Sequence, residues 1–287
     1  MNRKLIISNT IFWGLVLISC NHANQWHRNG NTGLTTNTIE GKDIAVVNQT
    51  VNTIARIYAK PEVPVLCYHR ISDGQKNEYR VSPATFAAHM KVLADSGYHS
   101  ILPAQLYDYL VNNKALPEKP VMITFDDSRV EHFVFAAPVL IKYGFKSVFF
   151  IMTITYNKKN YMTKEQIAQL AKDGHTVGLH SWDHTMVSKY KETADWQKQG
   201  VDPKEKLEKI VGRAVEYWAY PNGVYNRKGA EELSKYFKLS FTLASKRDSL
   251  QPLQTVRRMI VPECTPQGLL TSMHRTFGNK KIFTKFP

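Results

Sequence analysis

The sequence has little cysteine, with only Cys20, Cys67 and Cys264 among 287 residues. Three thiols cannot build the dense disulfide framework of a small secreted domain, and no two of them have the CxxC spacing of a structural zinc site. The sequence also lacks long apolar runs of the roughly 20 residues that a bilayer-spanning helix needs. With 43% hydrophobic and 22% charged residues, the chain has an ordinary globular composition, which excludes a disordered chain or a coiled coil.

Acidic residues are scarce: 24 Asp and Glu stand against 38 Lys and Arg, for a formal net charge of +14. Lysines between Glu131 and Glu165 have no acid among them, and neither do the basic residues from Arg275 to Pro287. Nucleic acid is not an expected partner, because the chain has no helix-turn-helix, zinc finger or RNA-binding signature. The basic excess is then either a solvated face or an attraction to anionic polymers of the cell envelope.

The N-terminus has the pattern of a secretory signal. Arg3 and Lys4 precede the largely apolar stretch Leu5 to Ile18, which suits the apolar region of a signal peptide. The following Leu17-Ile-Ser-Cys20 resembles the lipobox of bacterial lipoproteins. We therefore expect residues 1–20 to be a lipoprotein signal, with Cys20 as the lipid-modified anchor of a protein exported to the bacterial cell envelope. The alternative is a buried N-terminal helix that ends in an ordinary cysteine.

The remainder divides into a tether and one domain. Residues 21–42 are polar and lack periodicity, and a short helix is expected over Asp43 to Tyr58, so residues 21–62 form a polar tether with a short helix. Residues 63–287 form the catalytic domain. Apolar segments with strand character recur along it: Val63–Tyr68, Val121–Phe125, Ser147–Met152, Thr176–Leu179, Tyr217–Tyr220, Leu239–Leu243, Val256–Val261 and, weakly, Ser100–Ile101. With helices between them, these seven or eight β/α units favour an α/β fold with a parallel barrel.

Polar residues gather where the expected strands end. Asp126-Asp127 follow one apolar strand, and His180 and His184 follow another. Because active sites of β/α barrels lie at the carboxyl ends of the strands, these side chains are expected to converge. One Asp and two His can form a facial metal site, which leaves the other Asp free to act as a base. Taken alone, the aspartates could instead be a helix cap and a solvated residue.

These residues carry a family resemblance. Thr124-Phe-Asp-Asp127, His180-Ser-Trp-Asp-His184 and Tyr220-Pro-Asn-Gly223 resemble the first three motifs of the polysaccharide deacetylases, carbohydrate esterase family 4. The resemblance implies a distorted (β/α)₇ barrel and metal-dependent removal of acetyl groups from glycans. It also implies roles for individual residues: Asp126 as general base, Asp127, His180 and His184 as ligands of one divalent ion, and Asn222 as a backbone N–H donor to the oxyanion. Zn²⁺ is the expected ion, with Co²⁺ and Ni²⁺ as alternatives.

The sequence also departs from that family. Ser128 stands where many members have glycine, Ala219 replaces the arginine that braces the base, and no fourth or fifth motif is convincing. Pro64-Val-Leu-Cys-Tyr-His69 on the first strand resembles the branch of biofilm poly-N-acetylglucosamine deacetylases, which implies His69 as general acid. Arg257 or Arg258 could brace Asp126 instead of the missing arginine.

Other residues keep two interpretations. Trp182 and Tyr220 could stack on sugar rings or only pack in the protein. Cys67 is expected to be a buried apolar residue or to form a disulfide with Cys264. His175 precedes its strand and is expected at the opposite end of the barrel, in a structural role.

The expected function is removal of N-acetyl groups from an N-acetylglucosamine-containing polysaccharide. An O-acetyl xylan esterase with the same site, or a non-catalytic carbohydrate-binding lipoprotein, are the alternatives. A metal-dependent nuclease or phosphatase would draw on the positive charge but lacks a second carboxylate-rich metal site. The positive charge is expected to lie largely away from Asp126, Asp127, His180 and His184.

Overall fold

The computed structural model describes residues 38–39, 42–43, 51–75 and 77–278. The predicted signal with Cys20, the basic segment after residue 278 and most of the tether lie outside these residues. The chain divides into a unit of residues 1–48 and a unit of residues 49–287. In the first, β1 (Thr38–Ile39) pairs with β2 (Lys42–Asp43) in antiparallel fashion. The second unit carries the rest of the structure.

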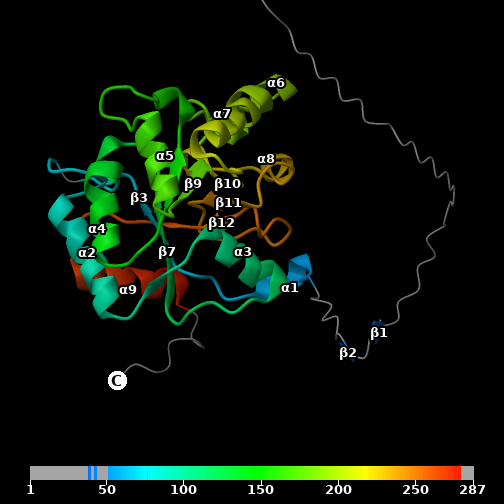
Figure 1. The fold of residues 1–287 in the computed structure, drawn as a ribbon, viewed down its shortest axis with the longest axis horizontal. Helices are drawn as coiled ribbons and strands as arrows, with labels where there is room; N and C mark the ends of the chain where they lie inside the picture. The colour runs from blue at the N-terminus through cyan, green and yellow to red at the C-terminus, as the bar shows by residue number, and fades with distance from the viewer. Residues whose placement is uncertain (1–37, 40–41, 44–50, 76, 279–287) are drawn as a thin grey trace, which may run out of the picture. The chain divides into compact units, whose positions relative to one another are not determined.

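The second unit is built on a ring of parallel strands (Figure 1). Neighbours pair in the order β3 (Val65–Tyr68), β7 (Pro120–Phe125), β8 (Val148–Ile151), β9 (Thr176–Leu179), β10 (Tyr217–Ala219) and β11 (Leu239–Thr242). The last strand closes the ring in two parts, because β12 (Val256–Arg257) pairs with β11 and β13 (Met259–Ile260) pairs with β3. This arrangement confirms the distorted (β/α)₇ barrel. The weak strand expected at Ser100 is β6 (His99–Ser100), which pairs with β7 outside the ring.

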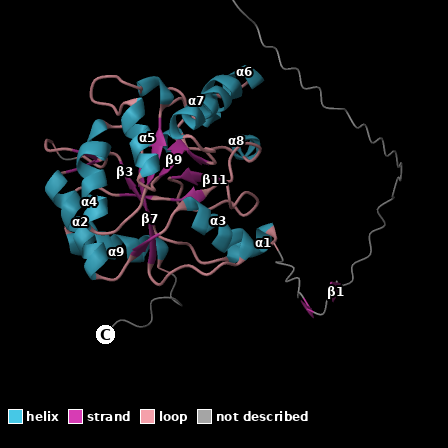
Figure 2. Cartoon of the chain, in the orientation of Figure 1, coloured by secondary structure: helices cyan, strands magenta, loops and turns pink. Residues whose placement is uncertain are grey.

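Helices surround the strands (Figure 2). They are α1 (Ile54–Ala59), α2 (Pro83–Asp95), α3 (Pro103–Asn112), α4 (Ala137–Lys142), α5 (Lys164–Lys172), α6 (Thr193–Trp196), α7 (Asp202–Val211), α8 (Arg227–Leu233) and α9 (Pro266–Phe277). A π-helical segment, His132–Ala136, leads into α4, and the short strands β4 (Arg70–Ile71) and β5 (Arg80–Val81) pair in parallel. Hydroxyls of Ser82 and Thr163 accept N-capping hydrogen bonds at the starts of α2 and α5, the role in which Ser and Thr are preferred at this position.

The helix expected over Asp43 to Tyr58 is shorter in the structure. Asp43 belongs to β2, and α1 begins only at Ile54. Thr53 sets this boundary, because its side chain accepts a hydrogen bond from the Arg56 N–H and its backbone is extended. None of the helices among the described residues has the length and apolar character needed to cross a membrane.

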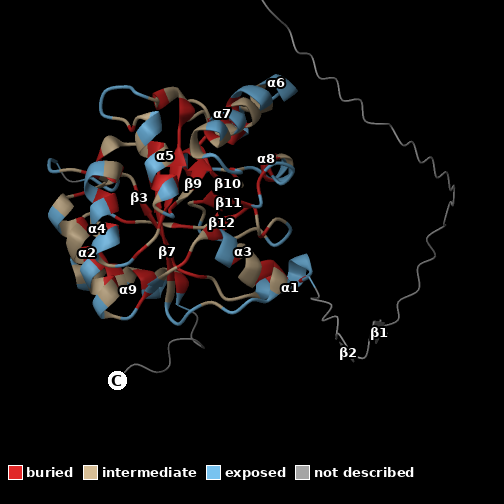
Figure 3. Ribbon diagram, in the orientation of Figure 1, coloured by how far each residue is buried: buried red, intermediate tan, exposed pale blue. Residues whose placement is uncertain are grey.

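The strands are buried on both faces (Figure 3). Along β8, Phe149 and Ile151 belong to one apolar cluster, with residues of α2, α4, α5 and α9, whereas Val148 and Phe150 belong to a second. This alternation is the period of two expected of a strand. The second cluster also contains Leu106 and Leu110 of α3, so apolar side chains fill the barrel interior and continue to the helices at its amino-terminal end.

Candidate active site

Polar side chains predicted from the sequence follow the carboxyl ends of four strands. His69 follows β3, Asp126 and Asp127 follow β7, His180 and His184 follow β9, and Asn222 follows β10. Positive φ angles are concentrated here, at Asp127, Ser128, Ser181, His184 and Asn222. Such angles are uncommon in residues other than glycine, and strained backbone of this kind gathers at functional sites.

Asp127, His180 and His184 form a compact group of possible metal ligands. Asp127 Oδ1 lies 3.6 Å from Nε2 of His180 and 3.6 Å from Nε2 of His184, and one ligand atom from each residue falls within 4.8 Å of the others. Ligand atoms at about 2.0–2.2 Å around one tetrahedral ion lie roughly 3.3–3.6 Å apart. These side chains therefore fit a single divalent ion.

The orientation of His180 supports the same conclusion. Its Nδ1 lies 2.8 Å from the carbonyl oxygen of Ala219, which can only accept, so Nδ1 carries the proton and the lone pair of Nε2 is left for a metal ion that would lie between His180 and Asp127. A backbone acceptor behind the imidazole is the usual arrangement of a metal-binding histidine. Ser181 fixes the other end of the turn, because its hydroxyl accepts a 2.8 Å hydrogen bond from the His184 N–H.

Asp126 is held by Arg258. The two guanidinium nitrogens donate to the two carboxylate oxygens at 2.6 and 2.7 Å, and both side chains are buried. Burial alone would raise the pKa of Asp126, but the charge and the hydrogen bonds of Arg258 oppose it, and the pKa lies well below its usual range. Of the two arginines that the sequence offered, Arg258 is the one at the carboxylate, whereas Arg257 pairs with Glu62 at 2.8 Å.

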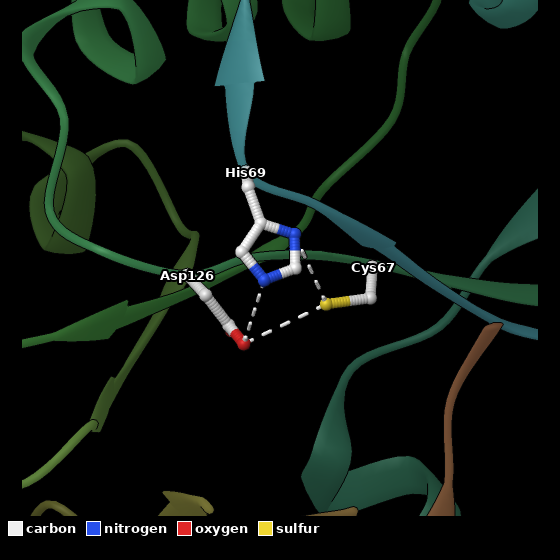
Figure 4. A group of neighbouring side chains, drawn as sticks. All are labelled: Cys67, His69 and Asp126. Atoms are coloured by element: carbon white, nitrogen blue, oxygen red, sulfur yellow. Dashed lines mark hydrogen bonds and ion pairs between the residues drawn. The ribbon is translucent and has the colours of Figure 1, made fainter. Parts of the chain in front are cut away.

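Cys67 and His69 complete the surroundings of Asp126 (Figure 4). Cys67 Sγ lies 3.6 Å and His69 Nε2 lies 3.8 Å from Asp126 Oδ2. The distances alone would permit a second metal, but Arg258 already occupies both oxygens of Asp126. Burial also raises the pKa of the Cys67 thiol, whereas a metal ligand must be the thiolate. The Cys67 thiol therefore supports Asp126 through a hydrogen bond, and His69 lies within ion-pair distance of the same carboxylate.

The two cysteines are free thiols. Cys67 is buried, Cys264 is half-buried, and no disulfide joins them. Cys264 Sγ instead lies 3.5 Å from His89 Nε2.

Burial lowers the pKa of His69, and the charges of Asp126 and Asp127 only partly oppose this effect.

The two aromatic residues next to the motifs differ from the site residues. Tyr220 is fully buried, and its hydroxyl donates to the carbonyl of Gln254 at 3.0 Å. Its ring packs inside the protein, which favours packing over stacking on a sugar, because a ring without exposed surface cannot reach a ligand. Trp182 is half-buried, with the ammonium of Lys198 4.6 Å from its ring centroid.

His175 lies at the opposite end of the barrel, as expected. It precedes β9 and is buried, and its Nδ1 accepts a 3.1 Å hydrogen bond from the Ser147 N–H. Burial lowers its pKa to about 4, so it is neutral at physiological pH and structural.

A pocket of about 490 Å³ opens beside the metal-ligand group. Its lining includes Asp127, Asp183 and His184, and three cations, Arg70, Arg129 and Lys158, that the sequence did not single out as site residues. The sequence indicated these cations only weakly. Arg70 directly follows His69, and Lys158 belongs to the segment without acids between Glu131 and Glu165. Three of the 38 Lys and Arg residues therefore line a pocket beside the site.

A closed parallel barrel with these carboxylates and imidazoles at its carboxyl end has the architecture of a barrel enzyme. The family model described as "Polysaccharide deacetylase" matches residues 113–237. A Bacillus subtilis strain 168 protein, YxkH, whose name assigns it to the polysaccharide deacetylases, is 33% identical over 198 residues, covering 68% of this chain and 70% of its own. The chain therefore belongs to the polysaccharide deacetylase family.

Solved structures agree with this assignment. The Streptococcus pyogenes deacetylase PplD, solved in complex with acetate, is 25% identical, with a TM-score of 0.68 over 75% of this chain and 99% of its own. IcaB from Ammonifex degensii is 27% identical, with a TM-score of 0.64 over 77% of this chain and 98% of its own. Both cover the barrel, so the fold and the deacetylase class rest on sequence and structure together.

Proposed function

We propose that the protein is a metal-dependent enzyme that removes N-acetyl groups from a polysaccharide containing N-acetylglucosamine. The observation that carries the proposal is the placement of the Asp127, His180 and His184 ligand group beside Asp126, a carboxylate that Arg258 keeps ionised. Support for the N-acetylglucosamine class comes from the first-strand His69, which resembles the poly-N-acetylglucosamine branch of the family, and from the similarity to IcaB.

The ligand set of two imidazoles and one carboxylate suits Zn²⁺, and Co²⁺ or Ni²⁺ accept the same donors. A bound divalent ion supplies Lewis-acid polarisation of the acetyl carbonyl and lowers the pKa of a coordinated water. The ion would be held by Nε2 of His180, Nε2 of His184 and Oδ1 of Asp127.

Asp126 is the general base in this proposal. Arg258 holds both of its oxygens, which fixes the direction of the carboxylate and keeps it ionised, and Asp126 takes the proton of the attacking water. The Asn222 backbone N–H is assigned to the oxyanion that forms on the acetyl carbon.

His69 is assigned the second proton transfer. Its Nε2 lies 3.8 Å from Asp126 Oδ2, and the charges of Asp126 and Asp127 partly offset the lowering of its pKa by burial. The protonated imidazole gives its proton to the leaving amine nitrogen. The C–N bond breaks as the amine is protonated, which releases acetate and the free amino sugar.

The proposal is tested by acetate release from N-acetylglucosamine oligosaccharides together with metal analysis. Asp126→Asn should lower kcat by about 100- to 10,000-fold while metal content stays at the level of the unmodified protein. His180→Ala should lower both. His99→Ala, an exposed histidine outside the ring of strands, serves as the control. Unchanged turnover in either site variant contradicts the assignment, and release from acetylated xylan alone would favour the O-acetyl esterase.

A further inference from the structure

The pocket beside the proposed metal site has an unusual balance of charge. Three cations line it, Arg70, Arg129 and Lys158, together with two acids, Asp127 and Asp183. Both acids are already engaged. Asp127 faces His180 and His184, and Asp183 Oδ1 accepts hydrogen bonds from the N–H and the hydroxyl of Thr185 at 3.0 and 2.6 Å. Among the residues that the structure describes, neither acid forms an ion pair with Arg70, Arg129 or Lys158.

The two arginines share one carboxylate as an ion-pair partner. Arg70 Nε and Arg129 Nε each lie 3.5 Å from Oε1 of Glu131, which is 7% exposed. Arg129 also stacks on Tyr161, with its guanidinium carbon 4.7 Å from the ring centroid. One negative charge shared between two guanidinium groups leaves a net positive charge at this wall.

The terminal nitrogens of these arginines are available to a ligand. Within the described residues, the Nη atoms of Arg70 and Arg129 make no hydrogen bond, and Lys158 forms no ion pair. The side chain of Arg129 is only 14% exposed and that of Arg70 is 40% exposed. Cations that served solubility alone would extend into water, whereas these two are held at a pocket wall by a buried carboxylate.

From this wall we infer that the preferred glycan carries an oxyanion, a carboxylate or a phosphate, next to the sugar that loses its acetyl group. This inference rests on the proposed function and specifies its substrate class. The paired N–H groups of a guanidinium match the two oxygens of a carboxylate or phosphate. Arg70 and Arg129 bind the oxyanion, Lys158 adds attraction at the rim, and the acetyl group lies over Asp127 and His184.

The test compares oligosaccharides of equal length: neutral N-acetylglucosamine oligomers, the same oligomers with O-lactyl carboxylates, and the same with a phosphate on a neighbouring sugar. We expect an anionic substrate to have a KM lower by about 10- to 100-fold at low salt, with a similar kcat. The ratio of neutral to anionic KM should fall as NaCl rises, because salt screens these charges. The anionic substrate with the larger neutral-to-anionic KM ratio shows whether the preferred oxyanion is a carboxylate or a phosphate.

Variants assign the effect to the wall. Arg129→Gln should reduce the neutral-to-anionic KM ratio by about tenfold, and Arg129→Lys should restore it only in part, because a lysine lacks the planar fork. Lys158→Gln should reduce the ratio less, and Lys159→Gln, the neighbouring lysine that does not line the pocket, is the matched control. Binding of the deacetylated anionic product to the unmodified protein, measured by calorimetry at two salt concentrations, gives a readout independent of the variants' folding.

The possible failures are distinct. Equal kcat/KM for neutral and anionic oligomers at every salt concentration would overturn the inference and leave the deacetylase function in place. Absence of acetate release from all of the oligomers would overturn the proposed function, and the inference with it.

Discussion

Asp126 and Asp127 are adjacent, yet their environments give them different chemistry. Successive side chains of an extended strand point to opposite faces, but the φ of 74° at Asp127 breaks this alternation. Both carboxylates can then face the same end of the barrel. Asp126 is 1% exposed and paired with Arg258, whereas Asp127 keeps 29% of its side chain exposed and faces the two imidazoles.

Removal of Arg258 tests how strongly the buried pair supports the fold. Arg258→Met leaves Asp126 buried without its counter-charge, and breaking such a pair costs about 3–5 kcal/mol. Urea unfolding should show this loss, and adding Asp126→Asn should recover much of it. Arg257→Met, which breaks a more exposed pair with Glu62, is the control and should cost less. Equal losses in the two single variants would contradict this account.

At the residue level, the sequence predicted the site residues that directly follow the ends of strands. Asp127, His180 and His184 could be grouped because parallel strands bring their carboxyl ends together. The choice between Arg257 and Arg258 stayed open, since it depends on an interruption of the last strand that apolar patterning does not reveal. Glu131 gave no signal at all, because an acid near a helix start is usually a solvated residue and only the fold brings Arg70 next to it.

At the scale of elements, the apolar strands were well predicted and the charged helices were not. Thr176–Leu179 matches β9 residue for residue, because a short buried strand is continuously apolar. The segment from Thr193 to Val211 was assigned no helix, although α6, a π-helical segment and α7 fill it. Only Pro203 and Leu207 of α7 are buried, so its apolar stripe is too narrow to stand out in the sequence.

Gly178 in β9 offers a test of barrel packing. A Cβ there would lie 2.6 Å from the Phe150 ring and 2.9 Å from the Tyr217 carbonyl oxygen. Gly178→Ala should therefore lower the free energy of unfolding by about 1–3 kcal/mol, the usual cost of overpacking. Gly200→Ala is the matched control, since a Cβ there meets nothing within 4 Å. Thermal unfolding measures both, and equal stability of the two variants would show that the interior accommodates the methyl group.

At the scale of the whole molecule, the ring of strands closes through backbone pairing and apolar packing. Metal ligands occupy only its carboxyl end, after β7 and β9. A metal ion bound by Asp127, His180 and His184, as proposed, would therefore add to a barrel whose strands are paired without it.

Chelation should separate activity from folding. Treatment with a chelator should stop acetate release while the far-UV circular dichroism spectrum is retained. The melting temperature should then rise with added Zn²⁺, because a ligand at about 100 times its Kd stabilises the folded state by about 2.7 kcal/mol. His180→Ala should lose this dependence. A melting temperature of the unmodified protein that does not change with added Zn²⁺ would contradict the metal assignment.

The two-part last strand also sets the order in which the site can form during synthesis. Arg258 lies 132 residues after Asp126, and β13 supplies the neighbour that β3 lacks on its other edge. A growing chain that ends before residue 256 has an open strand edge and no counter-charge for Asp126. The surroundings of Asp126 are therefore completed only after Arg258 has been made, and chains that end before residue 256 keep an incomplete site.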